Sequence, residues 1–141
     1  MMRLLILLVI SSFIFFGCKT SSVSLTHTPP ALLDSSTFSL TAVSEDSSYG
    51  YTAKNAIQTG GGAEGERRYL NALTGPNGET VTYIRLGSCC AFKTPNGIID
   101  NTGLLDKYEV RYEGLSKPVI LYLNMYDSGD MKAPVNFGYK K

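Results

Sequence analysis

The chain has 141 residues, of which 13 are basic and 12 acidic, giving a formal net charge of +1. Because it has no basic excess and no Lys/Arg cluster larger than Arg67-Arg68, the sequence excludes nucleic-acid binding driven by counterion release. Nine tyrosines, six phenylalanines and 14 glycines, with no tryptophan, favour strands and turns over helices.

The first segment, residues 1–17, is typical of a secretory signal peptide. Arg3 precedes an almost wholly apolar run from Leu4 to Phe16, and the small residue Gly17 follows it. The run is shorter than the roughly 20 apolar residues that a membrane-spanning helix needs. We therefore expect the segment to be removed. The remaining residues 18–141 have balanced acidic and basic side chains and are long enough for one domain.

The stretch FFGC, which ends at Cys18, resembles the lipobox of bacterial lipoproteins. In that family the cysteine sulfur receives a diacylglycerol group, the peptide is cut before it, and the new amino terminus is acylated, for example with palmitate. The resemblance implies a lipid anchor at Cys18, held by about 0.8 kcal/mol for each buried methylene. The tract Lys19–Ser22 contains no acidic residue, so we expect the periplasmic face of the outer membrane. The alternative is an ordinary signal peptide with a chance cysteine.

The next segment, residues 18–36, is rich in Ser, Thr and Pro and has no periodicity, which is typical of a flexible tether. We expect a single β-rich domain over residues 37–141, with a first strand where apolar and polar residues alternate at 38–43. Residues 67–73 are ambiguous. Gly75-Pro76 suits the end of a helix, but GPNG followed by alternating residues suits a hairpin, which we favour.

Two strands are predicted in the second half of the chain. Residues 104–113 alternate, with Leu104, Tyr108 and Val110 on an apolar face, which indicates a half-buried strand. The run 119–126 is apolar on both faces and should lie centrally in the sheet. Pro-Asn-Gly, at Pro76 and again at Pro95, predicts two turns. With no sustained helical period outside the leader, the fold class is all-β or β-rich α+β, a small antiparallel sandwich or open barrel.

Cys89 and Cys90 are adjacent, and they are the only remaining thiols if Cys18 is acylated. The compartment outside the inner membrane oxidises thiols. In an extended strand their side chains would point to opposite faces, and ordinary packing is the reading we favour. The alternative is a vicinal disulfide, which brings the two Cα atoms closer than relaxed disulfides do and is easily reduced. A zinc site lacks ligands, because the single histidine, His27, lies in the tether.

The remaining motifs indicate no catalytic residue, metal or cofactor. The glycine-rich stretch 60–65 lacks the Lys-Ser/Thr of a phosphate-binding loop and no strand-then-helix pattern surrounds it, so we expect a mobile surface loop. Arg67 and Arg68 are possible anion contacts, although a solvated strand edge paired with Glu64 or Glu66 is the simpler reading. Gly-x-Ser-x-Gly and His-Glu-x-x-His are both absent from the sequence.

Three blocks of the sequence resemble a family of small Bacteroidetes lipoproteins. They are SEDSSYGYTAKNAI, GERRYLNALTGPNGETVTYIRLGSCCAFKTPNGIIDNTGLLDKYEVRYEGL and LYLNMYD, which cover nearly all of the chain beyond the tether. The resemblance implies no activity for particular residues. Some relatives are labelled 2-dehydro-3-deoxyphosphooctonate aldolase, an enzyme similar to other (β/α)₈ barrels, which take about 250 residues.

Three hypotheses about function follow. We prefer a lipid-anchored, non-catalytic domain that binds an envelope protein or ligand through tyrosine-rich strand faces. An enzyme, such as the aldolase, is an alternative that predicts a cleft of convergent charged residues with shifted pKa values. A vicinal-dithiol sensor is the other alternative, and it predicts that Cys89 and Cys90 are exposed and reactive.

Overall fold

The computed structural model describes residues 40–141, and these residues form the β-rich fold that the sequence predicts. The larger sheet contains β1 (Ile57–Gln58), β3 (Thr82–Lys93), β4 (Thr102–Arg111) and β5 (Val119–Asn124). Its spatial order is β1-β5-β4-β3, with β3 and β5 antiparallel to β4 and β1 parallel to β5. A smaller sheet pairs β2 (Leu73–Thr74) with β6 (Gly138–Tyr139) in antiparallel fashion, and a short 3-10 helix, η2 (Ala53–Asn55), precedes β1.

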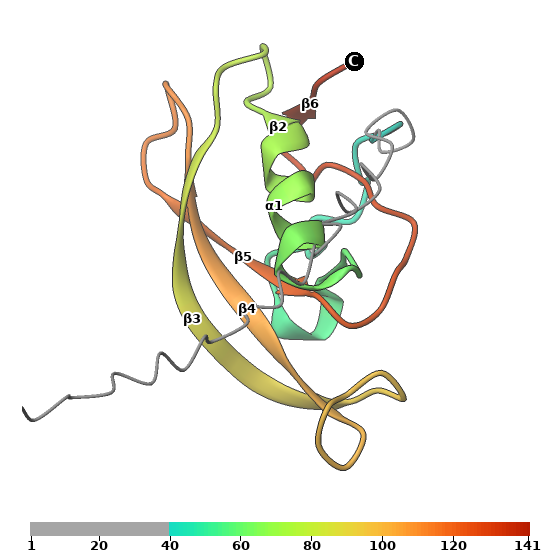
Figure 1. Ribbon diagram of the computed structural model, residues 1–141. Helices are drawn as coiled ribbons and strands as arrows, with labels where there is room; N and C mark the ends of the chain where they lie inside the picture. Colours follow the sequence, from blue (N-terminus) through green and yellow to red (C-terminus); the bar gives the residue numbers. More distant parts are fainter. Residues whose placement is uncertain (1–39) are drawn as a thin grey trace, which may run out of the picture. The chain divides into compact units, whose positions relative to one another are not determined.

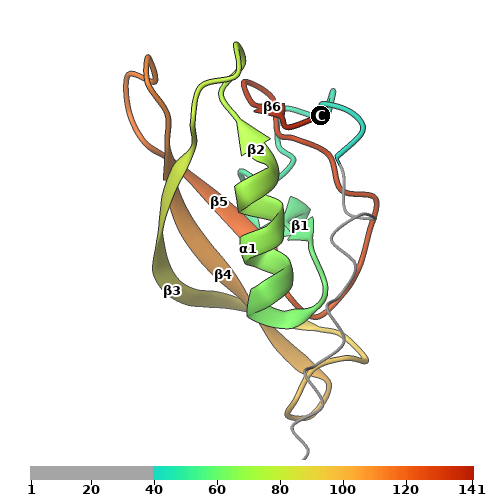
Figure 2. The ribbon, with the colours of Figure 1, turned by 45° about the horizontal axis from the view of Figure 1, so that its top comes forward.

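Helix α1 (Gly62–Ala72) lies along one face of the larger sheet, so the layers of the domain are a sheet and a helix (Figure 1; Figure 2). Tyr69 and Leu70 of α1 are buried in the same core as Val110 of β4 and Leu121 and Leu123 of β5. Together these side chains exclude water from the space between helix and sheet. Because fully burying one such side chain contributes about 1.5–3 kcal/mol, this contact is the main source of stability for the helix.

The prediction of a hairpin at residues 67–73 is wrong, because α1 extends to Ala72. The prediction that no helix follows residues 1–17 is wrong for the same reason. The buried positions of α1 include Glu66, Tyr69 and Leu70, which have the i, i+3, i+4 spacing of a helical stripe. The first residue of this stripe, Glu66, is charged, and glycines occupy other positions of the helix. The apolar residues therefore show no clear helical period in the sequence. The helix ends at Ala72, because Leu73 is already extended with φ of −72° and ψ of 151°.

The glycine-rich stretch 60–65 is predicted above to be a mobile surface loop with no strand-then-helix pattern around it, and the structure corrects both points. It connects β1 to α1, and Gly62 to Gly65 form the first turn of the helix. Gly65 is buried against the chain, because a Cβ added there would meet the Gly60 carbonyl oxygen well inside contact distance and the Thr59 carbonyl oxygen at 3.2 Å. The glycines therefore allow the helix to start close to the end of the strand.

The predictions for the second half of the chain are largely confirmed. Residues 119–124 form the central strand β5, and both Pro-Asn-Gly turns close with hydrogen bonds of 3.0 Å, from Gly78 N to Gly75 O and from Gly97 N to Thr94 O. In β4 the helix-facing side chains include Tyr108 and Val110, which are buried as predicted. Leu104, predicted with them, is 44% exposed, whereas Leu105 on the alternating face is buried.

The predicted first strand at residues 38–43 is not present as a strand over its described part. Residues 40–43 contribute a single bridge, between Val43 and Ala133, and Leu40 enters the core. Residues 38 and 39, together with the predicted signal peptide, Cys18 and the whole predicted tether (18–36), lie outside the described residues.

Candidate functional site

A groove of about 480 Å³ opens between η2 and the far end of β3. Part of its floor is Leu105, which alternates along β4 with the helix-facing Asp106 and Tyr108, so the groove lies on the sheet face opposite α1. The lining residues are Ala53, Lys54, Ala56, Gln58, Cys90, Ala91, Phe92, Lys93, Leu105, Asn124 and Asp127. Its surface is therefore part apolar and part polar.

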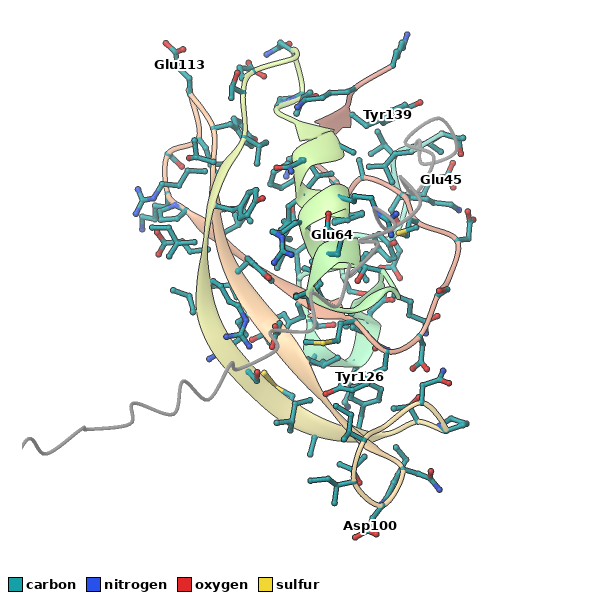
Figure 3. All side chains as sticks on the ribbon, viewed as in Figure 1. Glu45, Glu64, Asp100, Glu113, Tyr126 and Tyr139 are labelled. Carbon is teal, nitrogen blue, oxygen red and sulfur yellow. A yellow bond between two sulfur atoms is a disulfide. The ribbon has the colours of Figure 1, made fainter. Side chains whose placement is uncertain are left out.

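Cys89 and Cys90 form a disulfide with each other at the rim of this groove. Figure 3 shows the bond in yellow near the lower half of β3. Their Cα atoms are 3.8 Å apart, the spacing of a trans peptide. Cys90 is exposed, whereas Cys89 is partly buried opposite Leu105. The structure thus has the two sulfurs bonded rather than packed on opposite faces of the strand.

The polar side of the groove is held rigidly by a network around Asp127. Oδ1 of Asp127 accepts hydrogen bonds from Thr94 Oγ1 at 2.6 Å and from Asn96 Nδ2 at 2.9 Å, and Oδ2 accepts one from Asn124 Nδ2 at 2.9 Å. These bonds, that from Thr94 first, lower the pKa of Asp127 below its usual value. The carboxylate is therefore charged at neutral pH and fixed in position beside the groove.

The apolar side of the groove is fixed by an aromatic contact. The rings of Phe92 and Tyr126 meet edge to face, with centroids 6.0 Å apart and planes at 72°. A Cβ at Gly103 would lie 2.9 Å from both rings, so the glycine allows this approach. On the opposite wall, Lys54 has no ion-pair partner among residues 40–141. The groove thus offers a ring, fixed polar groups, two lysine side chains, Lys54 and Lys93, and the carboxylate of Asp127.

A second cluster, of acidic and hydroxyl side chains, lies beneath α1. Glu66 is fully buried, and its Oε2 accepts a hydrogen bond of 2.8 Å from the Tyr108 hydroxyl. Asp106 is 1% exposed and is held by Arg85, which donates from Nε at 2.6 Å and from Nη2 at 2.8 Å. The Ser88 hydroxyl donates to the same carboxylate at 2.6 Å. Two carboxyl groups, one paired with a cation, therefore share the buried space.

The two carboxyl groups of this cluster have oppositely shifted pKa values. The pKa of Glu66 is raised to about 7, chiefly by burial and also by the charge and contact of Asp106, against the opposing hydrogen bond from Tyr108. Burial also acts to raise the pKa of Asp106, but the bonds from Arg85 and Ser88 outweigh it and lower that pKa. Oε1 of Glu66 has no hydrogen-bond partner, and a buried oxygen without a donor favours the neutral, protonated carboxyl group.

The cluster beneath α1 lies apart from the groove. Glu66, Asp106, Tyr108, Arg85 and Ser88 line neither the groove nor two smaller hollows on the described surface. One of these hollows is apolar and lies at the end of the β3–β4 hairpin, where Asp100 and Tyr126 are labelled in Figure 3. The enzyme hypothesis predicts convergent charged residues with shifted pKa values inside a cleft. Among the groove residues Asp127 has a shifted pKa, which is lowered, and the carboxyl group with the raised pKa, Glu66, lies outside the groove.

The two arginines singled out in the sequence lie on α1 rather than on a strand edge. Arg67 pairs with Glu64 one turn earlier at 2.7 Å, with both side chains more than half exposed, so the pair contributes little to stability. The Arg68 guanidinium lies over the start of the helix, where a Cβ at Gly61 would be 3.2 Å from its Nη2. The structure does not bring either arginine into the groove.

The tyrosines of the predicted binding face have structural contacts of their own. All nine tyrosines lie within the described residues, and each is buried or partly buried. The hydroxyl groups of Tyr69, Tyr112 and Tyr139 donate hydrogen bonds to the backbone carbonyls of Lys132, Asn136 and Thr41. These three tyrosines therefore attach loops to the rest of the domain, and binding through the tyrosine-rich faces stays a prediction.

Sequence reasoning missed Glu66, Asp106 and most of the groove. A signal for the first two was present, because each is a charged residue at a position that the neighbouring apolar pattern assigns to the core. The groove had no such signal, since its walls come from four separate segments of the chain, residues 53–58, 90–93, 105 and 124–127.

Comparisons with known proteins give no match to a family model, to a curated protein or to a solved structure. Residues 40–141 contain no group of three His, Cys, Asp or Glu side chains placed to hold a metal ion. Within the same residues, no helix combines the length and the apolar character needed to cross a bilayer. The function must therefore be argued from the groove and from the sequence of the leader.

Proposed function

We propose that this chain is a lipid-anchored protein of the cell envelope that binds a small ligand in the groove. The observation that carries the proposal is a preformed cavity of about 480 Å³ whose polar and aromatic walls are each fixed by neighbouring side chains. A rigid site binds more tightly because less conformational freedom is lost on binding. The separation of this cavity from the titrating cluster beneath α1 supports binding over catalysis.

The chemistry of the lining favours a ligand with one apolar face, several hydrogen-bonding groups and negative charge. Phe92 and Leu105 present apolar surface, and Gln58 presents an amide that can both donate and accept. The unpaired Lys54 adds a positive charge at the rim. Asp127 has fewer acceptor positions left for hydrogen bonds to a ligand, because its oxygens already accept three hydrogen bonds.

The fold of residues 40–141 also favours a binding module over an aldolase, the label carried by some members of the lipoprotein family that the sequence resembles. The described domain has a four-stranded sheet and one α-helix. A (β/α)₈ barrel has eight parallel strands, each followed by a helix, and carries its active site on the loops after the strands.

The anchor part of the proposal rests on the sequence FFGC and predicts a specific result for Cys18. Wild-type protein should take up radioactive palmitate and sediment with the outer membrane, whereas Cys18→Ser should be unlabelled and leave the membrane fraction. A control variant, Cys89→Ser/Cys90→Ser, should be labelled like the wild type. Palmitate uptake by Cys18→Ser, or full-length unprocessed wild-type protein in the cytosol, would contradict the anchor.

The groove part of the proposal is tested by photo-crosslinking in living cells. A benzoylphenylalanine in place of Ala91, at the groove wall, should give a defined adduct, whereas one in place of Glu113, at the β4–β5 connection, should not. Lys54→Glu should reduce the Ala91 adduct at least about tenfold if a negative ligand is bound, because it reverses the rim charge. The matched charge change Lys117→Glu, outside the groove, should have no effect. Equal adducts from both positions would argue against the groove as the site.

A further inference from the structure

We propose that the Cys89–Cys90 disulfide is a thiol–disulfide exchange site, and that its reduction by a dithiol reshapes the groove. The reactant class is a vicinal or CxxC-type dithiol, such as the active site of an envelope reductase presents. The inference deepens the proposed ligand site and rests on it for its functional meaning, but the structural change it predicts is measured without any ligand.

The bond has no role as an ordinary cross-link. Disulfides stabilise a fold chiefly by closing a loop of the unfolded chain, and the effect grows with loop length. Cys89 and Cys90 are neighbours, so their bond closes no loop beyond a single peptide unit. Its structural effect must therefore be local, on the conformation of these two residues.

The backbone at Cys89 and Cys90 departs from an extended strand, and this departure is coupled to the disulfide. Consecutive side chains of an extended strand point to opposite faces, so two neighbouring cysteines cannot reach each other there. In β3, Cys89 pairs with Leu105 and Ala91 pairs with Leu104, which leaves Cys90 as an extra residue with no partner on β4. Cys90 has φ of +55°, a left-handed conformation. The left-handed turn brings the sulfurs together, and the bond in turn holds a non-glycine residue in a disfavoured conformation.

This bulge determines the shape of the groove. Cys90 and the three residues after it, Ala91, Phe92 and Lys93, all line the cavity. Their register against β4 depends on the extra residue at Cys90. Without the bond, Cys90 is free to return to the extended conformation that strand residues prefer. The following residues then change register, and a shift by one residue turns Phe92 away from Tyr126 and out of the groove.

The bond is accessible to exchange, because Cys90 is exposed. A thiolate of the dithiol attacks Sγ of Cys90, the Cys89–Cys90 bond breaks, and Cys89 leaves as a thiolate. The second thiol of the reactant then attacks the mixed disulfide, and Cys90 is released as a thiolate. Two protons from the dithiol end on Cys89 and Cys90, and the dithiol becomes a disulfide, so atoms and electrons balance.

The primary test uses the mature lipidated protein in detergent micelles, with and without 10 mM dithiothreitol as the dithiol probe. Native alkylation with iodoacetamide should modify both cysteines only after reduction. Amide hydrogen exchange at residues 91–93 and 102–104 should become at least about tenfold faster, while exchange in the β4–β5 pairing at Tyr108 and Leu121 stays unchanged. Resistance of the bond to the probe, or unchanged exchange after complete reduction, would overturn the proposal.

Two double variants distinguish the effect of the bulge at Cys90 on hydrogen exchange from the effect of the disulfide. Cys89→Ser/Cys90→Ser should exchange quickly in both conditions, like the reduced wild type. Cys89→Ser/Cys90→Gly should exchange slowly in both, because glycine adopts a positive φ at little cost and keeps the bulge without a bond. Equal exchange in the two variants would refute the role assigned to the left-handed turn.

The photo-crosslinking assay distinguishes failure of this inference from failure of the proposed function. Reduction should lower the adduct from position 91, whereas an adduct of equal yield in both redox states would retain the ligand site and reject its redox control. Absence of any adduct, together with faster exchange on reduction, would reject the ligand site and retain the exchange site.

Discussion

Replacing Glu66 with glutamine is expected to remove most of the loss of stability that the protein undergoes as pH rises from about 4.5 to about 7. In the folded protein burial raises the pKa of Glu66 to about 7, against an ordinary value of 4.5. Between these two values the unfolded chain releases a proton that the folded chain keeps, so rising pH favours unfolding. For this one group the loss amounts to about 3 kcal/mol, since one pKa unit corresponds to about 1.4 kcal/mol.

Glutamine fits the same contacts without a titrating proton. Its amide oxygen can accept the Tyr108 hydrogen bond, and its amide NH₂ can donate to Asp106. Urea unfolding followed by circular dichroism at pH 5 and pH 8 measures the effect. Glu66→Gln should be more stable than the wild type at pH 8 and close to it at pH 5.

The control for this experiment is Glu64→Gln, which changes an exposed carboxyl group on the same helix. It should leave the pH dependence as in the wild type. Asp106 contributes in the opposite sense, because its lowered pKa adds stability that is lost as pH falls below its ordinary value of 3.8. A wild-type unfolding free energy that is the same at pH 5 and pH 8 would show that Glu66 is not protonated in the fold.

Replacing Gly65 with alanine is expected to destabilise the protein by at least about 3 kcal/mol, near or above the upper end of what overpacking costs. The added methyl group would lie against backbone, 2.9 Å from the Gly60 carbonyl carbon and closer still to its oxygen. Backbone cannot rotate away as a side chain does, so the start of α1 must shift from the end of β1. The higher helix propensity of alanine offsets only about 1 kcal/mol of this cost.

The matched change is Glu64→Ala, one residue earlier in the same turn. It removes only an exposed ion pair with Arg67, which is worth less than about 1 kcal/mol. Thermal unfolding of both variants at one pH gives the comparison. If Gly65→Ala is as stable as Glu64→Ala, the close approach of helix and strand described above is incorrect.

The antiparallel strands could be predicted from the sequence because their side chains alternate over enough residues. β5 has apolar residues on both faces, and this pattern correctly indicated a central strand. In β4 the apolar face was predicted through Tyr108 and Val110, but Asp106 lies on that same face. A charge in phase with an apolar stripe is the signal that would have pointed to the buried cluster.

Helix α1 and strand β1 could not be predicted in the same way. The helix has few apolar residues on its buried side, where Glu66 replaces one of them, and its stability comes from packing on a sheet that is completed later in the chain. β1 has only two residues, and its parallel pairing with β5 joins segments more than sixty residues apart. The groove depends on both of these elements, which is why its residues appear unrelated in the sequence.

Strand β3 is the outermost strand of the larger sheet, and its interruptions have a consequence beyond the groove. An open β edge recruits foreign strands into fibrils when it presents a long unbroken row of amides and carbonyls. Here the register breaks at Leu86 and again at Cys90, so the longest regular run, Thr82–Arg85, has four residues. Such a short regular edge favours a protein that stays monodisperse even at high local concentration. Loss of the register break at Cys90 would lengthen the regular edge, and polymerisation would be expected to begin there.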